Sequence, residues 1–425
     1  MDQGNTAFLL IAAALVLLMT PGLAFFYGGL VKAKSVISMM MMSFGAMGLI
    51  GLLWVLYGYA ITFSNFGVGD FRGIDGIIGI DLSQLGLQAA FVEAADGNVT
   101  TAFPTLAFAA FQATFAIITV ALISGAIADR AKFGAWMVFA GVWATVVYFP
   151  VASWVFNFTF DADAGKIVDG GWIAYAVGAN DFAGGTAVHI NAGAAALALA
   201  LVLGKRVGFA KGASVPHNPP FVLLGAGLLW FGWFGFNAGS ELAADGVAAI
   251  AFLNTIAAPA AAILGWLIVE KIKDGKPTSV GAASGAVAGL VAITPACNIL
   301  SPFWAIVLGI LTGAVCAIAI DLKFKLGFDD SLDVVGIHLI GGLIGTLYIG
   351  LFGNNVGLIF GFGPAQLGKQ AIAAFAVLIY SFVLSFIIGT IIQKTIGFRI
   401  NNEDEIAGID TVIHGEEGYV LQDAR

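Results

Sequence analysis

Long apolar stretches, separated by charged and turn-forming residues, divide the chain into eleven segments. Each is close to the ~20 residues that a helix needs to cross the hydrocarbon core of a bilayer. The pattern therefore predicts an all-α polytopic membrane protein with eleven transmembrane helices. We expect these helices at residues 6–31, 35–63, 101–128, 133–156, 181–203, 219–238, 247–269, 280–298, 302–320, 334–352 and 370–393.

The composition supports the same class. Hydrophobic residues make up 60% of the 425 residues, charged residues only 10%, and the mean hydropathy is +0.96. A soluble domain of this length needs more polar surface. The 57 glycines suit helices that pack closely in lipid. We expect one compact transmembrane domain at residues 1–396, followed by a cytoplasmic tail at 397–425.

The positions of the basic residues predict how the chain sits in the membrane. All but three of the 18 Lys and Arg residues lie in the connections that begin at residues 32, 129, 204, 270 and 321, or in the tail from 394. The other three are Arg72, Lys166 and Lys369. Basic residues gather on the cytoplasmic side. We therefore expect the N-terminus outside and the C-terminus inside.

Eleven spans also divide as five, five and one, and a five-span repeat is necessarily inverted in the membrane. The fifth span carries Asp181 and then His189, and the tenth carries Asp333 and then His338. From the helical rise, His189 lies ~12 Å below one surface and His338 ~7 Å above the other, so ~10 Å of depth separates them unless a helix start is recessed. The pattern predicts two inverted five-helix repeats plus one C-terminal helix.

His189 and His338 lie well inside apolar spans, where ionisable residues are costly and usually functional. A single histidine in such a span is most often a satisfied packing residue. Two in corresponding positions of a repeat favour a pore role, because neutral imidazole both donates and accepts a hydrogen bond. Neither has a third ligand nearby, and Cys297 and Cys316 have no metal-ligand spacing. We expect no metal and no cofactor.

Asp181 stands at the start of its helix, where a carboxylate caps free backbone N–H groups. A carboxylate near the outer mouth also raises the local concentration of cations. Most aromatic residues near the span ends are typical of the membrane interface. The group beside Ser240 differs, because ring faces and a hydroxyl oxygen can replace water around a small cation. It contains Trp230, Phe231, Trp233, Phe234 and Phe236.

These segments resemble the ammonium transporter family that includes the Amt, Mep and Rh proteins, and the spacing is similar to that of bacterial Amt members. The longest matching motif is Asp181-Phe-Ala-Gly-Gly-Thr-Ala-Val-His-Ile-Asn. The likeness covers nearly the whole chain and extends to Thr20-Pro-Gly-Leu-Ala-Phe-Phe-Tyr-Gly-Gly-Leu, Phe111-Gln-Ala-Thr-Phe, Gly204-Lys-Arg, Gly232-Trp-Phe-Gly-Phe-Asn-Ala-Gly-Ser, Gly289-Leu-Val-Ala-Ile-Thr-Pro-Ala-Cys, Asp333-Val-Val-Gly-Ile-His and His414-Gly-Glu.

The resemblance implies a homotrimer in the plasma (inner) membrane with one pore in each subunit. It implies that ammonium, or methylammonium, binds at an outer site and loses a proton, and that ammonia crosses a narrow apolar lumen. By the same resemblance, Phe115 and Phe236 form a stacked gate, and Ser240 belongs to the outer site. His189 and His338 line the lumen.

One position departs from the family. The family usually has Trp where this sequence has Phe156, two residues after Trp154. Two arrangements follow from this: Phe156 forms the aromatic wall of the cation site with a weaker quadrupole, or Trp154 turns inward and takes its place.

The alternatives to transport are a sensor and an enzyme. A sensor usually carries an added signalling domain, and about 29 residues after Gly397 are too few for one. The spans contain no nucleophile with a base, so we expect no enzymatic activity. The resemblance also implies that the tail packs beneath a neighbouring subunit, and that a PII-type regulatory protein can close the pore from the cytoplasmic face. Nucleic acid is not an expected partner.

Overall fold

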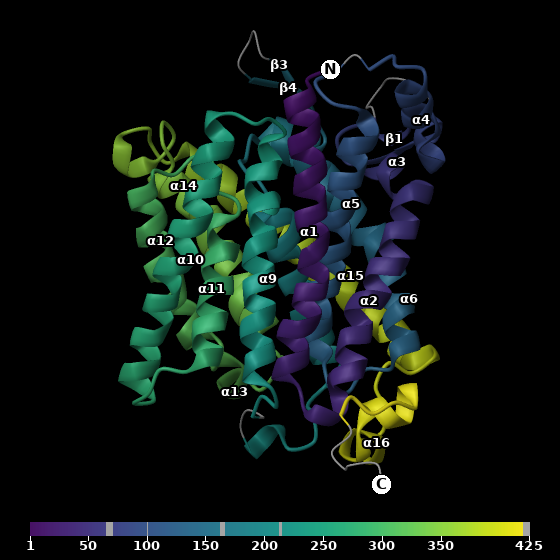
Figure 1. Ribbon diagram of the computed structural model, residues 1–425, viewed down its shortest axis with the longest axis vertical. Coiled ribbons are helices and arrows are strands. Elements are labelled where there is room, and N and C mark those ends of the chain that lie inside the picture. The colour runs from purple at the N-terminus through teal and green to yellow at the C-terminus, as the bar shows by residue number, and fades with distance from the viewer. Residues whose placement is uncertain (65–70, 100, 162–165, 212–214, 420–425) are drawn as a thin grey trace.

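The computed structural model describes residues 1–64, 71–99, 101–161, 166–211 and 215–419, and its helices stand side by side in one bundle (Figure 1). Within these ranges, ten helices are long and apolar enough to cross a membrane, and the shorter apolar helix Ser279–Ile293 corresponds to the remaining predicted span. The prediction of an all-α polytopic membrane protein is confirmed. Residues 420–425 of the predicted tail lie outside the described ranges.

Several spans are continuous helices, and others contain a 3₁₀ or π-helical turn. In chain order, the helical elements that form them are α1 (Gln3–Leu30), α2 (Val36–Leu53) with η2 (Trp54–Gly58) and α3 (Tyr59–Thr62), α5 (Thr105–Ile123) with η4 (Ser124–Ile127), α6 (Phe133–Trp143) with η5 (Ala144–Tyr148) and α7 (Phe149–Phe156), η7 (Gly185–Ile190) with α8 (Asn191–Leu203), α9 (Pro219–Ala238) with η9 (Gly239–Glu241), α10 (Gly246–Lys273), α11 (Ser279–Ile293), α12 (Pro302–Ala319), η10 (Val335–Leu339) with α14 (Ile340–Phe352), and α15 (Ala365–Thr395).

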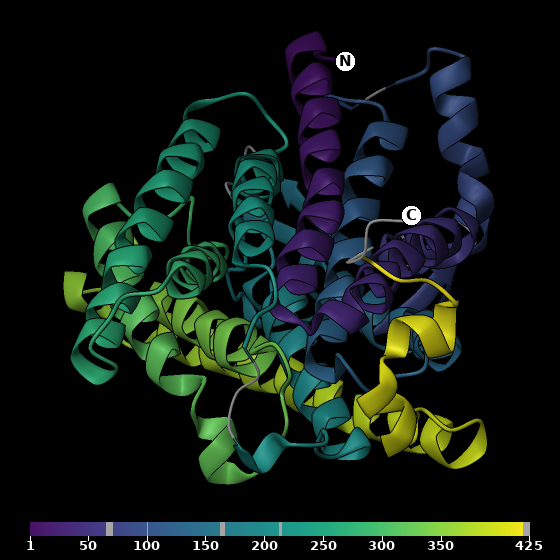
Figure 2. The same ribbon diagram turned by 60° about the horizontal axis from the view of Figure 1, so that its bottom comes forward.

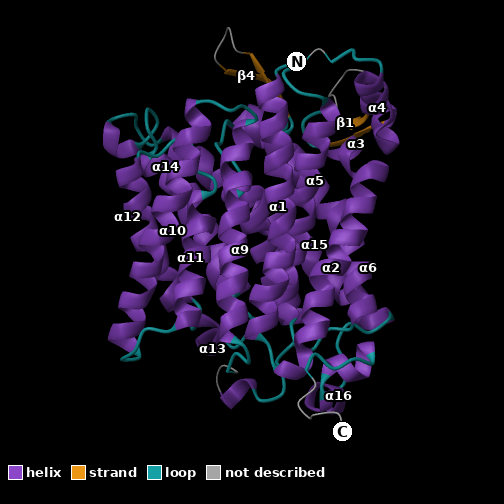
Figure 3. Cartoon of the chain, in the orientation of Figure 1, coloured by secondary structure: helices purple, strands orange, loops and turns teal. Residues whose placement is uncertain are grey.

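The bundle has two ends, which we call the N-terminal face and the tail face after the chain ends that lie there (Figure 1). The N-terminal face also carries α4 (Gln88–Ala95) and two strand pairs that an all-α prediction does not include (Figure 3). Strand β1 (Phe71–Ile74) pairs with β2 (Ile78–Asp81), and β3 (Phe158–Asp161) with β4 (Lys166–Gly170), both antiparallel. An Asp75-Gly76 turn joins β1 to β2, with Gly76 at φ +69°, as in many hairpins.

Glycine lets the longest helices approach one another closely. Helix α1 packs on α9, and a Cβ atom added at Gly225 of α9 would lie 2.2 Å from the backbone nitrogen of Phe26. Helix α10 packs on α12, and a Cβ atom at Gly309 would lie 2.1 Å from the carbonyl oxygen of Ala258. Since lipid offers no hydrophobic drive between helices, such backbone contact supplies the packing attraction.

The tail folds against the tail face, where α16 (Asn402–Ala407) and η12 (Asp410–His414) lie near the start of α2 (Figure 2). The Asp410 carboxylate accepts hydrogen bonds from the backbone nitrogens of Ile37 (3.0 Å) and Ser38 (2.7 Å). These are free donors in the first turn of a helix, which an acceptor satisfies. The short helix α13 (Leu322–Leu326) lies at the same end of the bundle (Figure 1).

Candidate functional site

The two histidines meet in the middle of the bundle. The Nδ1 atoms of His189 and His338 are 3.2 Å apart, and the rings lie nearly parallel with centroids 5.3 Å apart. His189 is 1% exposed and His338 3%. They come from η7 and η10, the π-helical turns that open α8 and α14. π-Helical turns of this kind are frequent at functional sites.

The ~10 Å of depth expected between the histidines does not apply, because one helix start is recessed, which is the exception that the expectation allowed. Helix η7 starts at Gly185, and the non-helical segment before it is already inside the bundle. The backbone nitrogen of Phe182 donates to the carbonyl oxygen of Pro295 (3.2 Å), and Asn180 donates to the Gln370 side chain (2.7 Å). The recessed start brings the two rings to the same depth.

Asp181 closes the start of the His189 helix. Its carboxylate accepts hydrogen bonds from the backbone nitrogens of Gly184 (2.9 Å), Gly185 (2.6 Å), Thr186 (2.7 Å) and Ala187 (3.1 Å), and also from the Thr186 hydroxyl. A carboxylate that satisfies this many free donors stabilises the first turn and fixes its direction.

The second half of the chain uses Asp330 in the same way, and the sequence interpretation missed it. Asp330 accepts from the backbone nitrogens of Val334 (3.1 Å) and Val335 (2.7 Å). Asp333, which the sequence pattern matches with Asp181, instead pairs with Lys323 and has a φ of +63°. The signal was present in the spacing, because Asp330 and Asp181 each stand eight residues before their histidine.

A stacked pair of phenylalanines lies next to the histidines. Phe115 of α5 and Phe236 of α9 have ring centroids 4.2 Å apart at an interplanar angle of 21°, and both are buried. The Phe236 ring is 6.0 Å from the ring of His189. The pair therefore lies across the approach to His189 from the end of α9 that carries Ser240.

The structure separates Phe156 from Trp154. The ring of Phe156 lies 6.3 Å from that of Phe115, nearly perpendicular to it. The Trp154 ring packs instead against Trp172 (5.7 Å) and Tyr380 (4.7 Å), and its Nε1 donates to the carbonyl oxygen of Ile77. Phe156 is thus the member of this pair that neighbours the stacked phenylalanines.

Ser240 lies one turn beyond Phe236, in η9 at the end of α9. Its hydroxyl is half-buried and donates to the carbonyl oxygen of Phe236 at 2.8 Å. Because the proton is used in this bond, the lone pairs of Oγ remain available to a donor such as a small cation.

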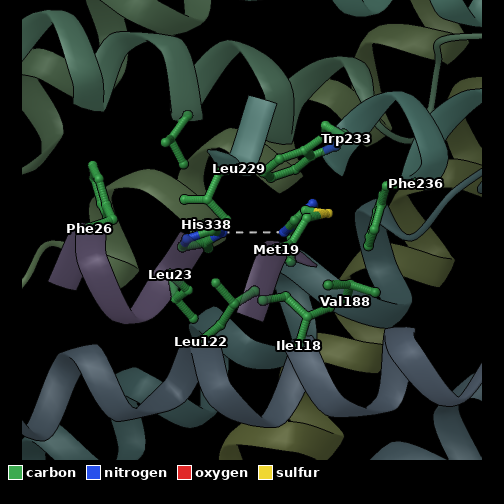
Figure 4. A pocket seen from close by; sticks show the side chains of 12 residues that line it. Met19, Leu23, Phe26, Ile118, Leu122, Val188, Leu229, Trp233, Phe236 and His338 are labelled. Carbon is green, nitrogen blue, oxygen red and sulfur yellow. Dashed lines mark hydrogen bonds between the residues drawn. The ribbon is translucent and has the colours of Figure 1, made fainter. Parts of the chain in front are cut away.

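A narrow cavity runs past the histidines, and its walls are apolar apart from them (Figure 4). Trp233 contributes only its ring face, because its Nε1 donates to the Thr294 hydroxyl (2.9 Å). The Nε2 atom of His189 is buried and has no hydrogen-bond partner among the described residues. The lining residues are Met19, Leu23, Phe26, Ile118, Leu122, Val188, His189, Leu229, Trp233, Phe236, Val287 and His338.

No group of three or more His, Cys, Asp or Glu side chains suited to a metal occurs in the described ranges. Cys297 and Cys316 are buried free thiols. Apart from the Trp233 indole nitrogen, which is bonded to Thr294, the side-chain nitrogens of the cavity lining are those of the two histidines.

A bundle of membrane-spanning helices around a narrow cavity that carries two buried histidines is typical of multi-pass membrane transporters. The profile of the Ammonium Transporter Family matches residues 7–419, so the chain belongs to that family. An ammonium transporter of Mycobacterium bovis is 54% identical over 98% of this chain and 90% of its own length. One of Bacillus subtilis is 44% identical over 99% of both chains.

Among solved structures, Mep2 of Saccharomyces cerevisiae matches with a TM-score of 0.81 and 33% identity, covering 95% of this chain and 91% of Mep2. The protein is therefore a multi-pass membrane protein that transports ammonium, and in a bacterium the membrane concerned is the plasma membrane. Its family is one of transporters and not of enzymes.

Proposed function

We propose that ammonium enters from the N-terminal face and that this face is the outer one. The cation binds beside the Ser240 hydroxyl, where the rings of Phe115 and Phe156 can replace part of its water by cation–π attraction. Asp181, near the same mouth, adds a negative field besides capping its helix. The cation then loses a proton, and ammonia passes between Phe115 and Phe236 into the cavity.

The observation that carries this proposal is the buried contact between His189 and His338. When two neutral imidazoles meet through Nδ1, one ring donates and the other accepts. The accepting ring then holds its proton on Nε2, while the donating ring has a free lone pair there. The pair therefore offers ammonia one donor and one acceptor in a wall that is otherwise apolar.

The apolar wall explains how the pore selects its substrate. An uncompensated ion in such a lumen costs several kcal/mol or more. Ammonium avoids this cost by crossing as neutral ammonia. Potassium cannot give up a proton, so it would have to cross as an ion and is excluded.

If a current accompanies uptake, the proton that ammonium loses needs a route of its own. The histidine pair is suited to this, because each neutral imidazole can accept a proton on one nitrogen and release one from the other. We propose that His189 and His338 relay it.

The test replaces both histidines by leucine, which has similar bulk, so that neither ring is left without its partner. Purified wild-type protein and the His189→Leu/His338→Leu variant are inserted in a bilayer and stepped with ammonium. We expect a current from the wild type and none from the variant. The mass of the complex and its melting temperature should show that both proteins assemble and fold alike. An unchanged current would show that the histidines are structural.

Uptake of labelled methylammonium by the wild-type protein separates transport from a purely sensing role, because neutral ammonia carries no current and a silent recording alone would not distinguish the two. We further propose that the chain forms a homotrimer, as the family resemblance implies. A PII-type protein is the proposed partner at the tail face, and it should lower the current when added on that side.

A further inference from the structure

Arg206, in the connection between α8 and α9, has a bidentate contact that transport through the histidine pair does not by itself explain. Its Nε and Nη2 atoms donate to the two carboxylate oxygens of Asp329, each at 2.9 Å, and its backbone nitrogen donates to the same side chain at 2.7 Å. Its Nη1 atom donates to Asp129 at 3.1 Å. All three side chains are at least nine-tenths buried.

Arg206, Asp329 and Asp129 form a buried cluster, and their opposite charges compensate one another. Burial works to lower the pKa of Arg206, but hydrogen bonds and charge interactions with Asp329 and Asp129 raise it above its usual value. Burial likewise works to raise the pKa of Asp329, yet Arg206 and Arg130 hold it below its usual value. Arginine and aspartate therefore both stay charged at neutral pH, where charge-assisted bidentate contacts are strong and directional.

The cluster holds the segment that caps the His338 helix, which we call the cap loop (residues 329–331). Arg206 holds the Asp329 side chain, while Arg130 donates to the Asp329 carbonyl oxygen (2.6 Å) and to the Ser331 hydroxyl. Between them, Asp330 accepts from the first backbone nitrogens of the His338 helix. Both neighbours of the capping residue are thus fixed by buried arginines.

His338 stands three residues after Val335, the first residue of η10. The position of this short helix start therefore determines where the imidazole lies. The contact with His189 is 3.2 Å between nitrogens, at the upper limit of a normal hydrogen bond. A shift of about 1 Å at the helix start would lengthen it beyond hydrogen-bonding range.

The tail reaches the same arginines. Glu405 accepts from the backbone nitrogen of Val207 (2.6 Å) and from the Arg399 guanidinium (2.8 Å). The backbone nitrogen of Ile400 donates to the carbonyl oxygen of Arg130 (3.0 Å). The tail is therefore bonded to the residue that follows Arg206 and to the backbone of Arg130.

We propose that Arg206 is a positioning residue for transport: its two-pronged contact with Asp329 sets the start of the His338 helix, and the docked tail acts on the histidine pair through it. This inference rests on the proposed function of His189 and His338. The guanidinium fork is required, because a lysine ammonium at this place cannot meet both oxygens of Asp329 and also Asp129.

The first test is Arg206→Lys, which keeps the positive charge and so does not leave two buried carboxylates unpaired. We expect the maximal ammonium current per folded trimer to fall about tenfold or more, as small misplacements of reacting groups do. The half-saturating concentration should not change, because the cation site is at the opposite face. A residue with a merely structural role would change the yield of trimer and not the current of each trimer.

The matched control is Lys273→Gln. This change removes an ion pair between Lys273 and Asp321 at the same face of the bundle and does not alter the cap loop. The Lys273 side chain is 43% exposed. Its current should equal that of the wild type. If Arg206→Lys does not fold, Arg206→Gln/Asp329→Asn removes both charges together and tests the same contact.

The second test concerns the tail. Glu405→Gln alone should lower the current, and in the Arg206→Lys background it should have no further effect. Additive losses would overturn the coupling of the tail to the pore through Arg206.

A wild-type current from Arg206→Lys, with no current from His189→Leu/His338→Leu, would overturn the positioning role and leave the proposed function intact. A wild-type current from the double-leucine variant would overturn the proposed function, and the positioning role with it.

Discussion

Trp154 and Phe156 stand two residues apart in α7, yet their rings have different neighbours. The ring of Trp154 is held by Trp172, Tyr380 and a bond to Ile77. The smaller ring of Phe156 lies beside Phe115. Of the two arrangements that the sequence left open, the geometry favours the one in which Phe156 forms the aromatic wall of the cation site.

Phe156→Trp should strengthen binding at the outer site, because the indole face attracts cations more strongly than a phenyl ring. A gain of ~0.5–1 kcal/mol corresponds to a half-saturating concentration of methylammonium about two- to fivefold lower. The measurement is uptake against concentration in vesicles. Trp154→Phe is the control and should leave the half-saturating concentration unchanged. The reverse pattern would move the cation site to Trp154.

Sequence reasoning at this scale found residues whose chemistry is unusual for their surroundings. His189 and His338 stand out because ionisable groups are rare in apolar spans. Asp330 does not stand out, since several acidic residues surround it, and its hydrogen bonds to the helix start distinguish it from Asp333 in the structure. Equal spacing to the histidines was the one clue in the chain itself.

Helix boundaries mark the limit of prediction at the scale of elements. A long apolar stretch locates a span, but it carries no information about how deep in the bundle the helix begins. For η7 that depth is set by long-range contacts such as the bond from Phe182 to Pro295, which no local pattern encodes. The ~10 Å estimate holds only for helices that start at the membrane surface, so the sequence alone could not decide whether it applied. The strand pairs were missed because they are short and lie in the connections.

The tail makes contacts with the rest of the chain that the sequence did not predict. The family resemblance implies a tail that packs beneath a neighbouring subunit, and the described residues 397–419 also make several bonds with the bundle of their own chain. Besides Asp410 and Glu405, Tyr419 meets the His217 ring through its hydroxyl at 2.8 Å. These contacts tie the tail to the loops between spans.

Deleting residues 397–425 should therefore lower transport while leaving the trimer assembled, because the contacts between spans remain. Uptake of labelled methylammonium per trimer measures the loss, and the mass of the solubilised complex checks assembly. Asp410→Asn is the milder companion change and should give a smaller loss, since one contact of the tail is weakened. Full activity of the truncated protein would remove the tail from the mechanism.

At the scale of the whole molecule, the class of fold was predictable because the bilayer imposes it: apolar helices of sufficient length are the only structures that these segments can form in lipid. The contact between His189 and His338, one from each half of the chain, was not predictable, although the repeated pattern suggested that the two correspond. This contact places the two rings together in a cavity whose other walls are apolar. The proposed transport mechanism therefore requires that a neutral molecule passes through this cavity.

The most direct test of that claim is uptake of labelled methylammonium into vesicles containing the purified protein, measured as potassium is raised to a large excess. We expect that uptake does not change and that potassium itself does not enter, because an ion that cannot lose a proton cannot cross the apolar lumen. Competition by potassium in proportion to its concentration, or a potassium flux through the protein, would contradict it.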